Sequence, residues 1–361
     1  MRPLAKGLRI AVIVSMLVIS AALIYPQLSP GAFRPDFGVF WTAARIAQTD
    51  PIRIYDVVAM TEAQRWLTDP ANGPRPFAYP PSALILFAPF SVLPFLPAFA
   101  LWTALSLAAF AMATQRFVDW RGTALCLAAP PVVLAVLTGQ VALLVASATI
   151  TALAQIERRP ILAGALFGLG AAVKPQALLL APLALVRGGH WSSLAAAIVT
   201  GSAMLGASLM WDPELWRIWL NAIAGFQTIT TGLGLDTAAL TPASAATMMS
   251  LSSGARMAFI GAGAVTGITL TWWGFAERDL TRRIVTLVSG SLLCSPYAMM
   301  YELAVLVPAA TALLLSRRPI GLAASLALTG LGGLAAVLML VLAVLTGGRP
   351  ARTSRAVQGD E

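Results

Sequence analysis

Charged side chains are scarce in this chain, because Asp, Glu, Lys and Arg together make up 11% of its 361 residues, while 58% are hydrophobic. Soluble domains carry about 25% charged residues. The composition therefore excludes an ordinary soluble protein and predicts an integral membrane protein. The apolar runs are continuous rather than alternating, which favours a bundle of helices over a membrane β-barrel.

Residues that bind metals or form disulfides are also scarce. The chain has two cysteines and one histidine, and both Cys126 and Cys294 lie within apolar runs, so neither a disulfide nor a metal site is indicated. A phosphate-binding loop, a dinucleotide fingerprint and an acidic metal box are all absent, so no cofactor is predicted. The net charge of +9 comes mainly from arginines scattered in short loops, which is typical of topology signals and not of nucleic-acid binding.

The apolar runs predict an all-α polytopic bundle of about 11–12 transmembrane helices that forms one membrane domain over residues 1–361. The arginines place the short loops in the cytoplasm if residues 80–95, which hold four prolines, do not cross the membrane. Residues 319–346 could form either one membrane-crossing helix or two shorter crossings. The side of the membrane on which the polar tail 347–361 lies is therefore undecided. The predicted helices are 10–29, 97–116, 122–138, 140–156, 160–174, 176–187, 192–210, 255–276, 282–299, 301–316 and 319–346.

Two longer segments are predicted on the outer face of the membrane. The first, residues 30–79, contains apolar residues at helical spacing in 38–48 and in 56–67, which predicts two amphipathic helices on the membrane surface. The second, residues 211–254, begins with closely spaced tryptophans, as in an interfacial aromatic belt. Its Gly/Thr-rich part, 228–241, is expected to be a mobile loop.

Asp36 stands just after the first apolar segment, at the expected membrane boundary. Partial burial there would raise the pKa of the carboxyl toward the range in which it accepts a proton from a hydroxyl group. Asp36 is therefore the candidate general base. The alternative is a hydrated carboxylate that neutralises Arg34.

Polar residues also interrupt the later apolar runs. A lysine inside a membrane is costly, so Lys174 is expected to face a cavity and to pair either with Glu302 or with the phosphate of a ligand. Such polar breaks, together with the first outer segment, predict a cleft that opens outward at membrane depth. The candidate substrate-binding residues are Arg75, Tyr79, Gln140, Lys174, Gln176, Tyr297 and Glu302.

Several short motifs follow one another along the chain: Asp36, Tyr55-Asp56, Phe77-Ala78-Tyr79-Pro80-Pro81, Gly139-Gln140, the glycine-rich stretch 164–175 that ends in Lys174-Pro175, Ser295-Pro296 and Tyr301-Glu302. In this order, from about residue 10 to 316, they resemble glycosyltransferase family 87, a bacterial branch of the GT-C membrane transferases. A histidine that is usual after the Ser-Pro pair is replaced here by Tyr297, and a usual Tyr-Asp becomes Tyr301-Glu302.

The resemblance implies transfer of a sugar, such as mannose, another hexose or a pentofuranose, from a polyprenyl-phosphate carrier to a lipid or glycan acceptor. The reaction would take place on the outer face of the bacterial inner membrane, with Asp36 at the place of the catalytic aspartate. One carboxylate base without a carboxylate nucleophile predicts inversion at the sugar. Tyr297 can donate a hydrogen bond to a phosphate but carries no positive charge, which leaves the donor open.

Two other classes of protein remain as alternatives. A secondary transporter or flippase of the envelope-glycan pathway is disfavoured because no inverted repeat is visible. A non-catalytic scaffold of envelope synthesis would be favoured if Tyr297 meant loss of activity. The sequence names neither the sugar nor the acceptor, and it leaves the oligomeric state undecided.

Overall fold

The computed structural model describes residues 2–28, 35–69, 73–232, 240–315, 328–331 and 333–346. All regular elements in these ranges are helices, which confirms the predicted all-α class. The α-helices are α1 (Arg2–Ile24), α2 (Phe37–Ile46), α3 (Val57–Ala63), α4 (Leu84–Ser91), α5 (Phe95–Thr114), α6 (Trp120–Leu127), α7 (Pro130–Thr138), α8 (Ala142–Gln155), α9 (Pro160–Val173), α10 (Ala181–Arg187), α11 (Trp191–Leu209), α12 (Glu214–Gly232), α13 (Pro242–Met248), α14 (Ser253–Gly274), α15 (Leu280–Cys294), α16 (Val307–Leu315) and α18 (Gly333–Thr346). The 3-10 helices used below are η2 (Pro51–Tyr55), η4 (Pro81–Ala83), η5 (Pro175–Leu178) and η6 (Met300–Val305).

Four helices are long and apolar enough to cross a membrane: Arg9–Leu28, which includes most of α1, and α5, α11 and α14. A fifth candidate is the pair α6 and α7, which was predicted as one helix but bends by 60°. The bend falls where Pro130 and Pro131 begin α7, because a proline inside a helix removes a backbone donor and clashes with the preceding turn. The other apolar helices are shorter than the ~20 residues that span a bilayer.

Close packing of small residues joins α9 to α11. A Cβ at Gly164 would collide with the backbone carbonyl of Ser193, and one at Gly168 would lie 2.6 Å from that of Ala197. Glycine at these two positions, one helical turn apart, therefore lets the two helix backbones touch, as is common between helices in membranes.

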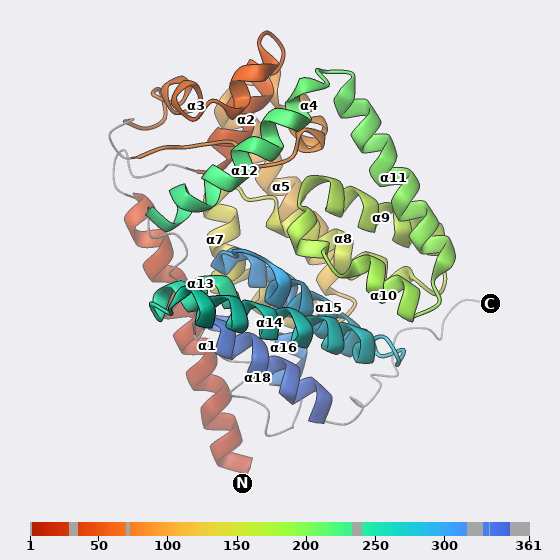
Figure 1. Cartoon of the computed structure of the whole chain (residues 1–361). Helices are drawn as coiled ribbons and strands as arrows, with labels where there is room; N and C mark the ends of the chain where they lie inside the picture. Colours follow the sequence, from red (N-terminus) through yellow and green to blue (C-terminus); the bar gives the residue numbers. More distant parts are fainter. Residues whose placement is uncertain are drawn as a thin grey trace, which may run out of the picture.

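Two hydrophobic cores divide the described chain. The smaller core joins α2, α3 and α4 with the start of α5, with parts of α8 and with Leu215 of α12. We call residues 35–93 together with α12 the α2–α4 lobe, which lies at the top of Figure 1. The larger core joins most of the remaining helices. The junctions α7–α8, α9–η5 and α15–η6 bring polar residues to the region between the two cores.

Several elements differ from the sequence-based prediction. The outer segment 211–254 was expected to include a mobile loop from residue 228, yet α12 continues to Gly232; residues 233–239 lie outside the described part. The first half of 301–316 is a 3-10 helix rather than an α-helix. A turn at Gly330 precedes α18, while residues 319–327 of the predicted segment 319–346 lie outside the described part.

The first outer segment does form two helices, α2 and α3, near the predicted positions. Most of α2 is buried, however, whereas an amphipathic helix on a membrane surface would bury one face only. The sequence left open whether residues 80–95 cross the membrane. Within them η4 and α4 form a short helical pair over 81–91, which at about 1.5 Å per residue is too short to span.

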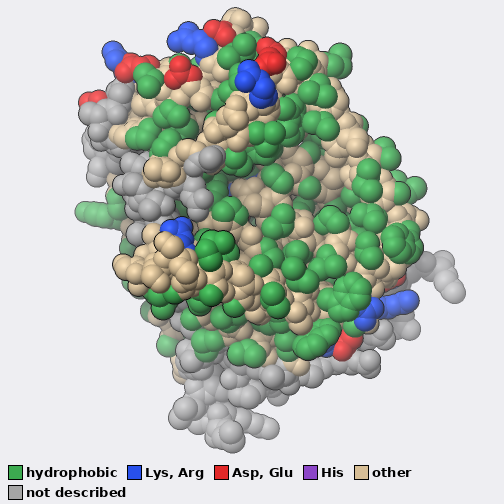
Figure 2. All heavy atoms as spheres, in the orientation of Figure 1, with side chains coloured by type: hydrophobic (Ala, Val, Ile, Leu, Met, Phe, Trp, Pro, Cys, Tyr) green, Lys and Arg blue, Asp and Glu red, His purple; other side chains and the backbone are tan. Residues whose placement is uncertain are grey.

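The surface is largely apolar over the helical body. In Figure 2 hydrophobic side chains cover much of the central face, while charged side chains gather mainly at the top, over the α2–α4 lobe, and at the lower right, over the α14–α15 loop. Such a band of apolar surface between two charged ends is what a membrane protein presents to the bilayer.

Candidate active site

Asp36 occupies the N-cap position of α2, but its side chain does not cap that helix. Its Oδ2 instead accepts a hydrogen bond of 2.6 Å from Nε2 of Gln140. The next residue, Phe37, is fully buried and anchors the start of α2. Packing of α2 therefore points the Asp36 carboxylate across to the α7–α8 junction. The rings around Phe37 are those of Phe90, Phe95, Phe99 and Trp102.

A glycine lets the α7–α8 junction approach α2 closely enough for this hydrogen bond. Gly139 ends α7 in the left-handed conformation, with φ 66° and ψ 34°, which residues other than glycine rarely adopt. A Cβ there would also lie 2.7 Å from Cβ of Phe37 and 2.7 Å from the ring of Phe99. The close approach of Gly139 to Phe37 is what brings Gln140 within reach of Asp36.

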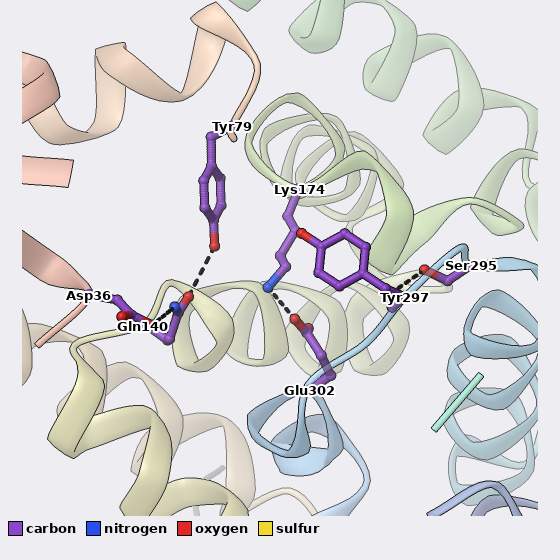
Figure 3. Close-up of polar contacts among 7 residues, drawn as sticks. All are labelled: Asp36, Tyr79, Gln140, Lys174, Ser295, Tyr297 and Glu302. Carbon is purple, nitrogen blue, oxygen red and sulfur yellow. Dashed lines mark hydrogen bonds and ion pairs between the residues drawn. The ribbon is translucent and has the colours of Figure 1, made fainter. Parts of the chain in front are cut away.

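Gln140 uses both ends of its amide. The Tyr79 hydroxyl donates to Oε1 of Gln140 over 3.0 Å, while Nε2 of Gln140 donates to Asp36. An ionised carboxylate only accepts hydrogen bonds, so the amide has one satisfactory orientation. Figure 3 shows the resulting chain from Tyr79 through Gln140 to Asp36.

Arg75 supports the backbone next to Asp36. Its Nη2 donates to the carbonyl of Pro35 over 2.9 Å, and its Nε donates to Oε1 of Gln64 over 2.9 Å. Nε2 of Gln64 donates in turn to the carbonyl of Arg75 over 2.9 Å. Two nitrogens of Arg75 thus tie the segment after residue 73 to the start of α2, and its predicted contact with a substrate stays a prediction.

The environment of Asp36 changes its basicity. Burial raises the pKa of the Asp36 carboxyl above its ordinary value, because the ionised form loses hydration. The hydrogen bond from Gln140 acts in the opposite direction, as do the positive charges of Arg75 and Lys174. Asp36 is therefore a stronger base than a solvated aspartate, and its neighbours limit the increase.

Lys174 ends α9 and carries a buried positive charge, since the residue is 2% exposed. Its Nζ pairs with Oε1 of Glu302 from η6 (Figure 3). The ring centroids of Tyr301 and Tyr79 lie 5.1 Å and 5.8 Å from the same Nζ. Of the two partners considered for Lys174 from the sequence, the structure shows Glu302, and both aromatic faces add to the compensation of the buried charge.

Tyr297 lies beside Lys174 in Figure 3, on the turn between α15 and η6. The Ser295 hydroxyl donates to the carbonyl of Tyr297 over 2.7 Å and shapes this turn. Gln176, in η5, makes no hydrogen bond to the network. The predicted residues that the structure does bring together are Asp36, Tyr79, Gln140, Lys174, Tyr297 and Glu302.

The sequence-based prediction missed the contribution of α12. Its Trp219 donates from Nε1 to the carbonyl of Ala78 over 3.1 Å, next to Tyr79. Its Phe226 packs against the ring of Tyr297, with centroids 5.6 Å apart. One helix thus contacts both sides of the network. The tryptophans of this segment were interpreted as an interfacial belt, although the three-residue spacing of Trp216 and Trp219 is also helical.

A small, mostly apolar cavity adjoins the buried pair, because Glu302 is one of its lining residues. Small side chains of α8 and apolar ones of α15 form much of its wall, with two hydroxyls among them. The residues that line it are Ala142, Val145, Ala146, Thr149, Ala177, Val288, Ser291, Leu292, Glu302 and Val305. The charged pair of Lys174 and Glu302 therefore lies next to a mainly apolar wall.

The family model of glycosyltransferase family 87 matches residues 77–296, which is more than half of the chain. The match includes Tyr79, Gln140 and Lys174, begins after Asp36 and ends just before Tyr297. No curated protein and no solved structure matches the chain. The match agrees with the order of motifs in the sequence and with their convergence in the fold, so the chain belongs to glycosyltransferase family 87 and is a glycosyltransferase.

Proposed function

We propose that the chain is an inverting transferase that moves a sugar from a polyprenyl-phosphate carrier to a hydroxyl of a lipid or glycan acceptor. The sugar is mannose, another hexose or a pentofuranose. The observation that carries the proposal is a single side-chain network with a partly buried carboxylate, Asp36, at one end and a buried cation, Lys174, at the other. Displacement at a sugar carbon needs these two groups, a base for the acceptor and a positive charge for the leaving phosphate.

In the proposed step Asp36 takes the proton of the acceptor hydroxyl while the acceptor oxygen attacks the anomeric carbon. The bond between that carbon and the phosphate oxygen breaks, and its electron pair stays on the phosphate. Lys174 stabilises the charge that the phosphate gains. Within the network Glu302 is already paired with Lys174, so Asp36 is the carboxylate available to the acceptor, and a single displacement inverts the sugar configuration.

The neighbours of these two groups receive positioning roles. Gln140 and Arg75 hold Asp36 through a side-chain and a backbone contact. Glu302 neutralises Lys174 until the donor phosphate takes its place. Tyr297 can donate a hydrogen bond to a phosphate at Lys174, which is how the site would function without the usual histidine.

A lipid-linked donor is supported by the setting of Lys174 and Glu302. Lys174 lies where the short apolar helix α9 ends, and Glu302 lies in the first turn of the 3-10 helix η6. In membranes such breaks between α-helices are tolerated only beside protein or a cavity. No nucleotide-binding motif is present to hold a nucleotide sugar.

The donor class can be tested with the purified full chain in lipid vesicles. We expect turnover with a polyprenyl-phosphate sugar and an acceptor glycolipid from the same bacterial envelope, and none with sugar nucleotides alone. Product formation would be followed by mass spectrometry, with the Asp36→Asn protein as the inactive control. Equal turnover with a nucleotide sugar in vesicles free of carrier lipid would contradict the proposed donor.

The pH dependence of transfer should report the pKa of Asp36. Transfer requires the ionised carboxylate, so kcat/KM falls as the pH falls through this pKa. The hydrogen bond from Gln140 lowers the pKa, hence Gln140→Met should raise it and move the acidic limb of the profile to higher pH. The matched control is Gln176→Met, whose limb should stay in place because Gln176 is outside the network. If Gln140→Met lowered kcat/KM by the same factor at every pH, Gln140 would not influence the pKa of Asp36.

We further propose that the protein resides in the bacterial inner membrane with the α2–α4 lobe on its outer face. The scattered arginines of the opposite loops support this orientation. Val58, 73% exposed on α3, and Arg158, exposed after α8, are suitable positions for single cysteines once Cys126 and Cys294 are replaced by serine. A membrane-impermeant thiol reagent should label Val58→Cys and spare Arg158→Cys in intact spheroplasts; the reverse pattern would refute the orientation.

A further inference from the structure

Three loops that lie away from the α2–α4 lobe carry a concentration of arginines. Their contact is direct, because Oε1 of Glu157, after α8, lies 3.1 Å from Nη1 of Arg283 in α15 and 3.8 Å from Nε2 of His190, before α11. We call the arginines here the arginine cluster, part of which is visible at the lower right of Figure 2. The cluster comprises Arg158, Arg159, Arg187, Arg278, Arg282 and Arg283.

We propose that the arginine cluster binds the phosphate of an anionic phospholipid in the leaflet opposite the α2–α4 lobe. This proposal does not depend on the proposed sugar transfer. Three kinds of observation support it: the balance of charge in the cluster, the Arg187 guanidinium held over Trp272, and the depth at which the cluster lies.

Positive charge exceeds negative charge in the cluster, and its carboxylates are already engaged. Glu157 pairs with Arg283, Glu277 pairs with Arg282 over 2.5 Å, and Asp279 accepts the backbone N–H of Arg282 at the start of α15. Within the described residues no carboxylate forms an ion pair with the remaining members, which leaves them available to an anionic ligand. These members are Arg158, Arg159, Arg187 and Arg278.

Two arginines of the cluster have buried donors without partners. The Nε atoms of Arg187 and Arg282 are buried and make no hydrogen bond within the described structure. The guanidinium of Arg187 is also held over the ring of Trp272, 5.1 Å from its centroid. The buried Nε atoms are closed to a ligand, so a phosphate would be bound by the outer nitrogens of the guanidinium groups, through charge-assisted hydrogen bonds. Stacking on Trp272 holds the Arg187 guanidinium in place for this contact.

The depth of the cluster matches that of lipid headgroups. Trp191 begins α11, and Trp272 and Trp273 end α14, and all three are more than 40% exposed. Tryptophans at the ends of membrane helices mark the headgroup level. From Trp191, α11 leads to α12, which is part of the α2–α4 lobe and whose Trp219 contacts Ala78 there, so the lobe and the cluster lie at opposite ends of α11. At about 1.5 Å per residue its length is close to the hydrocarbon thickness of about 30 Å.

Binding can be measured by native mass spectrometry of the delipidated full chain in detergent, titrated with phosphatidylglycerol or with phosphatidylcholine. We expect the unaltered protein to prefer phosphatidylglycerol. In Arg187→Gln and in the double variant Arg158→Gln/Arg159→Gln, the affinity for phosphatidylglycerol should fall by about fivefold for each arginine removed. The matched control is Arg45→Gln, because Arg45 on α2 stacks on Trp41, at 4.7 Å, as Arg187 does on Trp272. Arg45→Gln should bind like the unaltered protein.

Three outcomes would overturn the proposal. The two lipids bind equally well, Arg45→Gln weakens binding as much as the cluster variants do, or inorganic phosphate displaces the lipid at concentrations close to the Kd of the lipid. The last would assign the cluster to a soluble phosphate. Thermal unfolding without added lipid serves as the folding check for each variant. If Arg187→Gln does not fold, the double variant decides, because Arg158 and Arg159 are exposed and make no ion pair in the described structure.

Discussion

Asp36→Asn is expected to abolish nearly all sugar transfer and to leave the protein folded in the membrane. Asparagine keeps the size of the side chain, and its carbonyl oxygen can still accept the hydrogen bond from Gln140. What it loses is basicity, and general base catalysis typically contributes about 10²–10⁴-fold to a rate. The rate of product formation in lipid vesicles, at saturating donor and acceptor, measures the effect directly.

Asp56→Asn is the matched control for this experiment. Asp56 lies in the same lobe, and its Oδ1 caps α3 by accepting the backbone N–H groups of Val58 and Ala59. Asparagine caps helices about as well as aspartate does, so this variant should keep both its stability and its transfer rate. If Asp36→Asn retained more than about a tenth of the activity, Asp36 would not be the base.

The second large effect is expected at the buried pair of Lys174 and Glu302. Lys174→Gln and Glu302→Gln each leave one buried charge without its partner, which typically destabilises a fold by about 3–5 kcal/mol. Both single variants should therefore unfold at lower temperature than the unaltered protein. Because Lys174 also faces the leaving phosphate in the proposed mechanism, Lys174→Gln should reduce kcat in addition to stability.

The double variant Lys174→Gln/Glu302→Gln separates the two roles of the lysine. With both charges removed, the folded state should recover most of its stability, since two neutral amides can bond to one another. Transfer should remain reduced by about 10²–10³-fold, the usual loss when one donor to a developing negative charge is removed. Thermal unfolding in lipid nanodiscs and single-turnover rates provide the two measurements. Recovery of stability and transfer together would show that Lys174 is a structural residue only.

These experiments also bear on the departure at position 297. Tyr297 replaces the histidine that is usual in the family, and it lies beside Lys174 on a turn held by Ser295. If Lys174 is the main source of positive charge for the phosphate, the chain can do without that histidine. The Lys174 variants therefore test whether the positive charge has a single source in this protein.

Composition and periodicity alone determined that this chain is an all-helical membrane protein. The scarcity of charge and the continuous apolar runs are local properties, so helices such as 160–174 and 192–210 were predicted within a few residues of α9 and α11. The break between α6 and α7 was missed even though Pro130 and Pro131 are visible in the sequence, because hydropathy does not distinguish a bent span from a straight one.

The order of motifs also determined the family, and Asp36 and Lys174 were identified as unusual charges from their places in the sequence. Which groups they meet was decided only by the tertiary structure. Gln140, 104 residues away, reaches Asp36 because Gly139 in its left-handed conformation lets two backbones approach. Lys174 meets Glu302 across 128 residues through the meeting of α9 and η6.

The role of Arg75 shows the same limit. Its charge in an outer segment suggested a ligand of phosphate, and only the structure shows that its Nη2 and Nε donate to Pro35 and Gln64. A sequence shows which side chains can donate, and only packing shows which acceptors lie within hydrogen-bond distance. Residue type and periodicity therefore determined the helices and the chemistry present, whereas long-range packing of α2, α8, α9 and η6 decided which of these groups form one site, because hydrogen bonds and ion pairs act over a few ångströms.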